Sequence, residues 1–522
     1  MKVNISEVYI VRVSNIGSNI SFGHKIIIDI GASNPKGTCK VLVKSDDGRD
    51  LSKTNGYLNN TTNGFSTKDE TGKKIDGGQA DFISKLDDVI FNAHRDVLRL
   101  ARDGKIHFAE DAKGSTKKDS MLSGVAVFVP GTTFTMCKDD RIAFIPNLRN
   151  DEGESLLDID FKKYEEEIKA GGRRARGLDP ARGFELVVTK DLGGAGLALA
   201  KVLAQRDELK IGDYIMGVMT GGGFGSVDIK VKGSEENPIV EFETSESSSY
   251  LSGNTQMHSK ISSTINDLFS KENPKAEFQR IKDEVGLDEF FPILGKLGRQ
   301  GVSVKSHLNC FLRGLELDAT EEEYANVMKL AQKAGDARLV TSDKMHIPAS
   351  DEALCEEIKA CKFFTEVESK DPEKRIFSIN RDYVTEEQID KARIAAVHDY
   401  ANAVSLISIN KINDCINRVY LVGPFAQGLN KDIKKSPDYY GAADLPSLIM
   451  QKINTNIDPE HVDLPSTKRL MKLYNFEVIC NPEINFPDNT FAGDMLLDKK
   501  LEFTPNRGSW FQIPLKTLKE SN

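Results

Sequence analysis

The sequence predicts a mixed α/β protein built from two domains, and three observations carry this prediction. The chain has 522 residues, which is too long for one ordinary domain and long enough to bury large cores. Short apolar runs rich in Val and Ile alternate with longer segments that have the period of a helix. Two glycine-rich segments, far apart in the chain, each lie between two strand-like runs, which indicates two halves of similar design.

Composition narrows the class of protein. The net charge of −9 argues against a nucleic-acid-binding role, which normally requires a basic surplus. The seven cysteines are scattered and never in CxxC spacing, which argues against a disulfide framework or a cysteine zinc site and favours a reducing compartment. No apolar stretch has the length of a membrane span and the first residues do not read as a signal peptide, so a cytoplasmic protein without membrane contact is expected.

The first glycine-rich segment, residues 25–44, reads KIIIDIGASNPKGTCKVLVK and predicts a strand, a turn and a second strand. Asp29 lies at the end of the first strand. Mg²⁺ with a bound nucleotide is typically held by one or two carboxylates together with phosphate oxygens and waters, so Asp29 is a candidate for the metal. An Asp before a glycine is also a common turn former, and both interpretations stay open here.

Helices and strands alternate between this segment and residue 207. Apolar residues at helical spacing predict helices within 79–103 and at 164–170, and β-branched runs predict strands at 124–129, 141–145 and 184–188. Residues 45–80 are rich in Asn, Gly, Thr and charge and predict turns and short edge strands. The basic segment 171–183, GGRRARGLDPARG, is read either as a solvated loop or as an anion-binding loop.

Asp191 follows the strand predicted at 184–188 and precedes a helix of small residues, LGGAGLALAKVLAQ. Open α/β sheets bind ligands at the C-terminal ends of their strands, so Asp191 is placed for catalysis. The glycines let the first turn of the helix approach a neighbour or a ligand closely. An Asp at this position also suits a helix N-cap, which is a purely structural role.

The second glycine-rich segment, residues 214–229, reads YIMGVMTGGGFGSVDI. Glycines let backbone N–H groups encircle an anion, which makes a phosphate site one interpretation. In dinucleotide-binding units and P-loops such glycines open a helix, and the chain contains no GxxxxGK[ST] motif. Here Val227, Ile229 and Val231 alternate with polar residues, as in a half-buried strand. A glycine hairpin without a ligand is the other interpretation.

The rest of the chain predicts mostly helix. Residues 262–336 have helical patterns, and 337–385 predict a local hairpin or loop insertion. A long helix, 386–417, leads into a strand at 418–422 and a turn at 423–426. The predicted domains are 1–207 and 208–490, with a tail at 491–522 that returns to the first domain.

Six motifs occur in one order: DIGAS at 29–33, VAVFVPG at 125–131, IPNL at 145–148, VVTKD at 187–191, MTGGGFGS at 219–226 and VYLVGP at 419–424. This order resembles the ROK family of sugar kinases and its glucokinase relatives, over roughly 25–260 and 386–430. The resemblance implies two α/β domains of the actin-like, ribonuclease H-like ATPase fold, with the nucleotide in a cleft between them and a helical insertion in the second domain.

The resemblance also implies roles for individual residues. Asp191 would be the catalytic base, and Asp29 would orient Mg²⁺ through its waters. Substrate hydroxyls would contact Asn147, Lys190, Glu243 and Glu246. The ATP-binding residues would be Gly31, Ala32, Ser33, Gly221, Gly222, Gly223, Gly225, Gly423 and Pro424.

Three departures from the family pattern bear on function. Lys190 replaces the asparagine that precedes the catalytic Asp, and Glu246 replaces the histidine of a Glu-x-x-His pair. No cysteine cluster follows and His258 stands alone, so no zinc is expected. The implied activity is ATP- and Mg²⁺-dependent phosphorylation of a sugar or polyol, with a homodimer as a candidate assembly. A catalytically inactive nucleotide or sugar sensor is the alternative, and an actin-like filament protein is disfavoured by the sugar-site residues.

Overall fold

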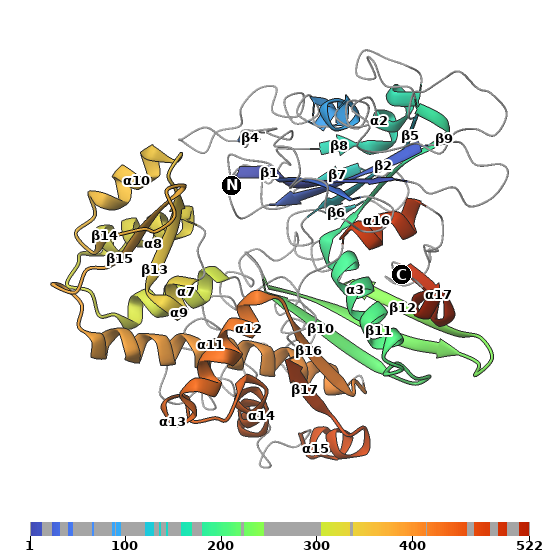
Figure 1. Ribbon diagram of the computed structural model, residues 1–522. Coiled ribbons are helices and arrows are strands. Elements are labelled where there is room, and N and C mark those ends of the chain that lie inside the picture. Colours follow the sequence, from blue (N-terminus) through green and yellow to red (C-terminus); the bar gives the residue numbers. More distant parts are fainter. Residues whose placement is uncertain are drawn as a thin grey trace. The chain divides into compact units, whose positions relative to one another are not determined.

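The computed structural model shows a mixed α/β chain, as the sequence predicts (Figure 1). The chain forms two compact units: unit 1 is Met1–Lys201 with Pro487–Asn522, and unit 2 is Val202–Phe486. The structure describes residues 2–12, 23–31, 40–44, 65–66, 86–88, 90–95, 121–129, 135–136, 142–144, 158–169, 180–220, 224–244, 304–334, 338–413, 415–456, 464–480, 489–497 and 511–520.

Unit 1 contains a sheet in the order β3-β1-β2-β5-β9, with the short strand β4 paired to β1. Its strands β2, β5 and β9 are mutually parallel. The bounds are β1 (Lys2–Arg12), β2 (Gly23–Gly31), β3 (Lys40–Lys44), β4 (Phe65–Ser66), β5 (Met121–Val129) and β9 (Pro180–Lys190). A smaller antiparallel sheet joins β6 (Thr135–Met136), β7 (Ile142–Phe144) and β8 (Asp158–Asp160).

The predicted hairpin at 25–44 is wrong. Strands β2 and β3 both form, but β1 lies between them, since Val8 pairs with Ile28 on one side and with Val41 on the other. The reason lies in the N-terminal sequence KVNISEVYIVR, which is rich in β-branched residues and pairs antiparallel with most of β2. The edge of β2 that a hairpin partner would need is therefore already used.

The core of unit 1 lies around its parallel strands. Residues 26–28 of β2 and 125–128 of β5 are fully buried, as expected for parallel strands that are covered on both faces. Residues of the C-terminal segment add to this core: a Cβ built on Gly493 would lie 2.7 Å from Cδ1 of Ile27. The described residues of unit 1 are helical at 86–88 and 90–95, within the helix predicted at 79–103. They also form α2 (Phe161–Lys169), α3 (Asp191–Gln205), which continues into unit 2, α16 (Asn489–Leu497) and α17 (Leu515–Glu520), next to the strand β18 (Phe511–Pro514).

Unit 2 contains an open sheet in the order β17-β16-β10-β11-β12. The predicted glycine hairpin is confirmed, because β10 (Tyr214–Thr220) pairs antiparallel with β11 (Phe224–Gly233). Strand β12 (Pro238–Thr244) continues the antiparallel half. On the other side of β10, β16 (Arg418–Val422) and β17 (Glu477–Cys480) run parallel to it.

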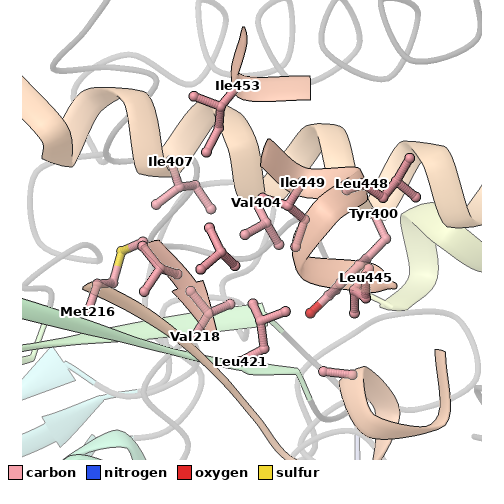
Figure 2. Close-up of a cluster of buried hydrophobic side chains, with 14 of the residues drawn as sticks. Met216, Val218, Tyr400, Val404, Ile407, Leu421, Leu445, Leu448, Ile449 and Ile453 are labelled. Carbon is pink, nitrogen blue, oxygen red and sulfur yellow. The ribbon is translucent and has the colours of Figure 1, made fainter. Parts of the chain in front are cut away.

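The long helix α11 (Glu386–Asn413) and α14 (Leu445–Asn456) bury the apolar half of this sheet. Figure 2 shows Tyr400, Val404 and Ile407 of α11 beside strand residues such as Leu421, with Leu445, Leu448, Ile449 and Ile453 of α14 in the same cluster. Three shorter helices complete this part of the unit: α12 (Pro424–Lys435), α13 (Pro437–Tyr440) and α15 (Leu464–Leu473). Helix α11 ends four residues before the predicted position.

The predicted insertion at 337–385 belongs to a larger α/β module, drawn yellow to light orange in Figure 1. Strands β13 (Lys344–Pro348), β15 (Lys374–Ile379) and β14 (Phe364–Val367) form an antiparallel sheet. The module has a core of its own because the preceding helices bury Leu308, Phe311 and Val327 against it. Its helices are α7 (Val304–Gly314), α8 (Glu321–Ala334), α9 (Arg338–Ser342) and α10 (Glu352–Lys359).

Candidate functional site

The strands that lead into two glycine motifs end next to each other at one edge of the unit 2 sheet. Strand β10 ends at Thr220, which pairs with Phe224, so residues 221–223 connect the two strands of the hairpin. In the neighbouring parallel strand Val422 pairs with Met219. Gly423 therefore follows Val422 beside Thr220, one strand spacing of about 4.8 Å away. This edge holds the C-terminal ends of the parallel strands, where open α/β sheets bind ligands.

Gly423 opens helix α12, which corrects the turn predicted at 423–426. It is the N-cap, with φ 101° and ψ 162°, and Pro424 follows within the first turn. This backbone region is open almost only to glycine, which explains the residue at this position. Proline suits the first turn because it has no N–H group to leave without a partner, although its presence after a strand reads as a turn in the sequence.

The N-terminus of α12 favours an anion. The first N–H groups of a helix have no partner within the helix, and the helix dipole places partial positive charge there. No side chain caps α12, and its first turn carries no acidic residue. Lys434 and Lys435 lie in the last turn of α12, where their positive charges complement the helix dipole. Burial raises the pKa of Asp432, which lies in the same helix. Phe425 fixes the first turn by packing edge-on against Tyr400 of α11, with ring centroids 5.4 Å apart.

A second set of predicted residues meets at the corresponding edge of unit 1. Asp29 in β2 pairs with Phe128 in β5, and Phe128 pairs with Thr189 in β9. Asp29 and Thr189 therefore occupy one row across three strands, about 10 Å apart. Lys190 ends β9 and Asp191 begins α3, so both directly follow this row. The backbone thus brings the predicted metal residue and the predicted base to the same sheet edge.

Glycine in the first turn of α3 permits a close contact, as the sequence predicts. Gly193 is buried, and a Cβ at this position would lie 2.7 Å from Cε2 of Phe511. Phe511 in β18 is itself 3% exposed, so its ring has little room to move. The C-terminal segment therefore fixes the start of the helix that carries Asp191.

The remaining predicted residues are only partly placed. For Asp29, Gly31, Lys190, Asp191, Gly225, Glu243 and Pro424 the structure describes the backbone within a helix or strand. Glu243 pairs with Asp228 across β12 and β11. Outside the described residues lie Ala32, Ser33, Asn147, Gly221, Gly222, Gly223, Glu246 and His258.

A buried polar cluster in unit 2 was not predicted. The alternation in β11 indicates that Asp228 faces solvent together with Lys230 and Lys232, yet Asp228 is 4% exposed and contacts Lys411 of α11. The alternation indicates that the two faces of β11 differ in polarity, but it does not indicate that a helix covers the polar face as well. The isolated Lys411 near the end of an apolar helix is the only sequence signal for the contact.

The described residues contain no group of three or more His, Cys, Asp or Glu side chains arranged to hold a metal ion. None of the described helices combines the length and the apolar character needed to span a membrane.

No protein-family model matches the chain, and no curated protein matches it. Among solved structures, the chain is similar to a glucokinase from Balamuthia mandrillaris in complex with glucose, with 10% identity and a TM-score of 0.39. The match covers 82% of this chain and 85% of that chain.

Proposed function

We propose that the chain transfers the γ-phosphate of ATP to a hydroxyl of a sugar or sugar-like substrate, with Asp191 as the general base. The observation that supports this most is the pairing of Met219 with Val422, which sets the end of β10 beside Gly423 at the kind of edge where open α/β sheets bind ligands. In the proposed site the ATP phosphates and ribose contact Gly221, Gly222, Gly223, Gly225, Gly423 and Pro424.

The nucleotide fits the residues that form this edge. Gly423 carries no side chain, has a backbone that only glycine adopts readily, and leaves the N-terminus of α12 uncapped. A glycine turn and a helix N-terminus are both places where backbone N–H groups bind phosphate oxygens. Gly31, the last residue of β2, and the following Ala32 and Ser33 form the second phosphate contact of the proposal.

Asp29 is the proposed Mg²⁺ residue, acting through water. Its place in β2, in the row that leads to Thr189, supports this role. When bound, Mg²⁺ neutralises charge on the phosphates during transfer. Asp29 orients that ion, and the glycines hold the nucleotide.

Asp191 is proposed to orient the acceptor hydroxyl and take its proton. A carboxylate suits phosphoryl transfer because positioning and late proton acceptance are what the protein must supply. Asn147, Lys190, Glu243 and Glu246 are proposed as substrate contacts, since carboxylates and amides are good partners for hydroxyl groups. No zinc enters the proposal. The proposed architecture of the chain is two actin-like domains, 1–207 and 208–490, that close on the substrate.

A sensor that binds nucleotide and sugar without catalysis is the second candidate. Lys190 directly precedes Asp191 at the end of β9, and a nearby ammonium group favours the ionised carboxylate and weakens it as a base. Glu246 in place of histidine favours the sensor as well.

The two candidates separate in one experiment. ATP turnover is measured against hexoses, amino sugars and polyols, with binding of each compound measured in parallel. Phosphorylated product from one compound supports the kinase. Binding of MgATP and a sugar without product on any compound supports the sensor, and failure to bind MgATP contradicts both.

A further inference from the structure

Three polar side chains meet inside unit 2, on the face of the sheet that α11 covers. Asp228 of β11, Lys411 of α11 and Tyr214 of β10 are 4%, 2% and 8% exposed. The Tyr214 hydroxyl donates a hydrogen bond to Oδ2 of Asp228 over 3.0 Å, and the Lys411 ammonium donates to the same oxygen. Lys411 also lies 3.3 Å from the Tyr214 hydroxyl oxygen, to which it donates.

Stability alone does not account for this cluster. Both donors converge on Oδ2, whereas Oδ1 of Asp228 has no hydrogen-bond partner in the part of the chain that the structure describes. An unsatisfied buried acceptor is unfavourable. The loss of water around a buried ion pair offsets much of its attraction, so apolar residues of similar volume are often at least as stable. Such pairs are best explained where they select one arrangement of the elements they join.

The elements joined here carry the two glycine motifs. Tyr214 begins β10, which leads into the glycine turn, and Asp228 lies on β11, which leaves that turn. Lys411 lies in the last turn of α11, whose connection leads to β16 and Gly423. The cluster thus connects the hairpin to the helix that precedes the second motif.

A second set of bonds fixes the start of β16 to the start of β10. The Asn417 N–H donates to the Tyr214 carbonyl over 2.9 Å, and the Tyr214 N–H donates to Oδ1 of Asn417 over 3.2 Å. The Asp213 carboxylate accepts a hydrogen bond from the side-chain amide of Asn417 over 2.9 Å and another from Arg418 over 2.6 Å. The two sets of hydrogen bonds together hold β10 and β16 at a constant distance from each other as they reach the sheet edge.

We propose that Lys411 and Asp228 are positioning residues that hold the paired ends of β10 and β11, Thr220 and Phe224, at a fixed distance from Gly423. The pair acts through the backbone of β11 and α11 and touches no ligand. The consequence for nucleotide binding rests on the proposed function, whereas the consequence for the backbone does not.

The test replaces the pair by uncharged residues of similar shape, Asp228→Asn with Lys411→Met, because single changes leave a buried charge without its partner. The control is Lys232→Gln with Glu241→Gln, which removes an ion pair between β11 and β12 whose Lys232 side chain is 59% exposed. Amide hydrogen exchange is followed in peptides covering 214–229 and 415–426, and MgATP binding is followed by calorimetry.

For the Asp228/Lys411 double variant we expect amide exchange in both peptides to rise, and the Kd for MgATP to rise about tenfold, while the melting temperature stays close to wild type. The control should change neither. Unchanged exchange in both peptides overturns the proposal. Raised exchange with unchanged MgATP affinity overturns the claim that this positioning supports nucleotide binding. If wild type binds no MgATP, the proposed function fails and exchange alone decides the positioning role. If the double variant does not fold, Tyr214→Phe must raise exchange in the same peptides, and no rise overturns the proposal.

Discussion

Met219 and Val422 lie side by side in adjacent parallel strands. Val422 directly precedes Gly423, and only Thr220 separates Met219 from Gly221 in the sequence. Because the two strands are in register at this row, the end of β10 and Gly423 reach the sheet edge together. Segments two hundred residues apart in the chain are thus joined at one place, roughly a strand spacing apart.

Gly423→Ala tests the backbone at this edge. At φ 101° and ψ 162° a Cβ is strained by about 1–3 kcal/mol, so the start of α12 should shift and the affinity for MgATP should fall about tenfold. Gly428→Ala is the matched control, because it lies within the same helix and its Cβ would meet no atom within 4 Å. That control should raise the free energy of unfolding by about 0.4–1 kcal/mol and leave binding unchanged. Equal MgATP affinity in both variants would count against a nucleotide at Gly423.

Gly193→Ala tests the support of Asp191. The new methyl would lie 2.7 Å from the Phe511 ring, which is buried, so the first turn of α3 must move. Small displacements of a catalytic group are costly, and we expect kcat to drop about 10²-fold with little change in the Kd for MgATP. Adding Phe511→Leu makes room and should restore part of the rate. A single variant with wild-type kcat would show that α3 does not need this position.

Asp29→Asn tests the proposed Mg²⁺ residue. A group that orients a metal through water typically contributes about 10- to 100-fold in metal affinity or activity, so activity should need a higher Mg²⁺ concentration by about that factor. Titrating Mg²⁺ at saturating ATP and substrate measures the shift. The same Mg²⁺ dependence in wild type and variant would leave Asp29 as a turn residue.

His398 predicts a pH dependence of stability. Its Nε2 donates to the Tyr440 carbonyl over 3.0 Å, and burial, followed by nearby Lys452, lowers its pKa below the ordinary 6.5. The unfolded chain therefore binds a proton before the folded one does as the pH falls. The contribution of neutral His398 to the free energy of unfolding is present above the unfolded pKa and is lost as the pH falls through the folded pKa. Melting temperatures of His398→Gln should fall less than those of wild type between about pH 7 and 5, and parallel curves would refute this.

In unit 2 the sequence located the β10–β11 hairpin, the long helix α11 and the strand β16, but not how they are covered. The hairpin of β10 and β11 and the bounds of β16 follow from local alternation and from glycine, which act over a few residues. The burial of Asp228 depends on α11, which lies far along the chain, so no local pattern reveals it. Gly423 and Pro424 suit a turn and a helix start equally well, and only the continuing helix decides.

Unit 1 shows the same limit for strand order. β2 and β3 were recognised as strands, yet their pairing depends on whether a third segment competes for the same edge. β1 does so, because its eleven residues offer a longer match than β3 does. The sequence predicts Asp29 at the end of one strand and Asp191 after another, and the strand register supplies the row that joins Asp29 to Thr189.

The most direct test of the proposed kinase is the rate at which Asp191→Asn transfers the γ-phosphate of ATP to the best substrate of the panel. Asn keeps the size and most hydrogen bonds of Asp and suits the start of a helix about as well, but it accepts no proton. We predict a single-turnover rate lower by about 10²- to 10⁴-fold, with the Kd for MgATP nearly unchanged. A rate near wild type would mean that Asp191 only begins α3, and would contradict the proposed mechanism.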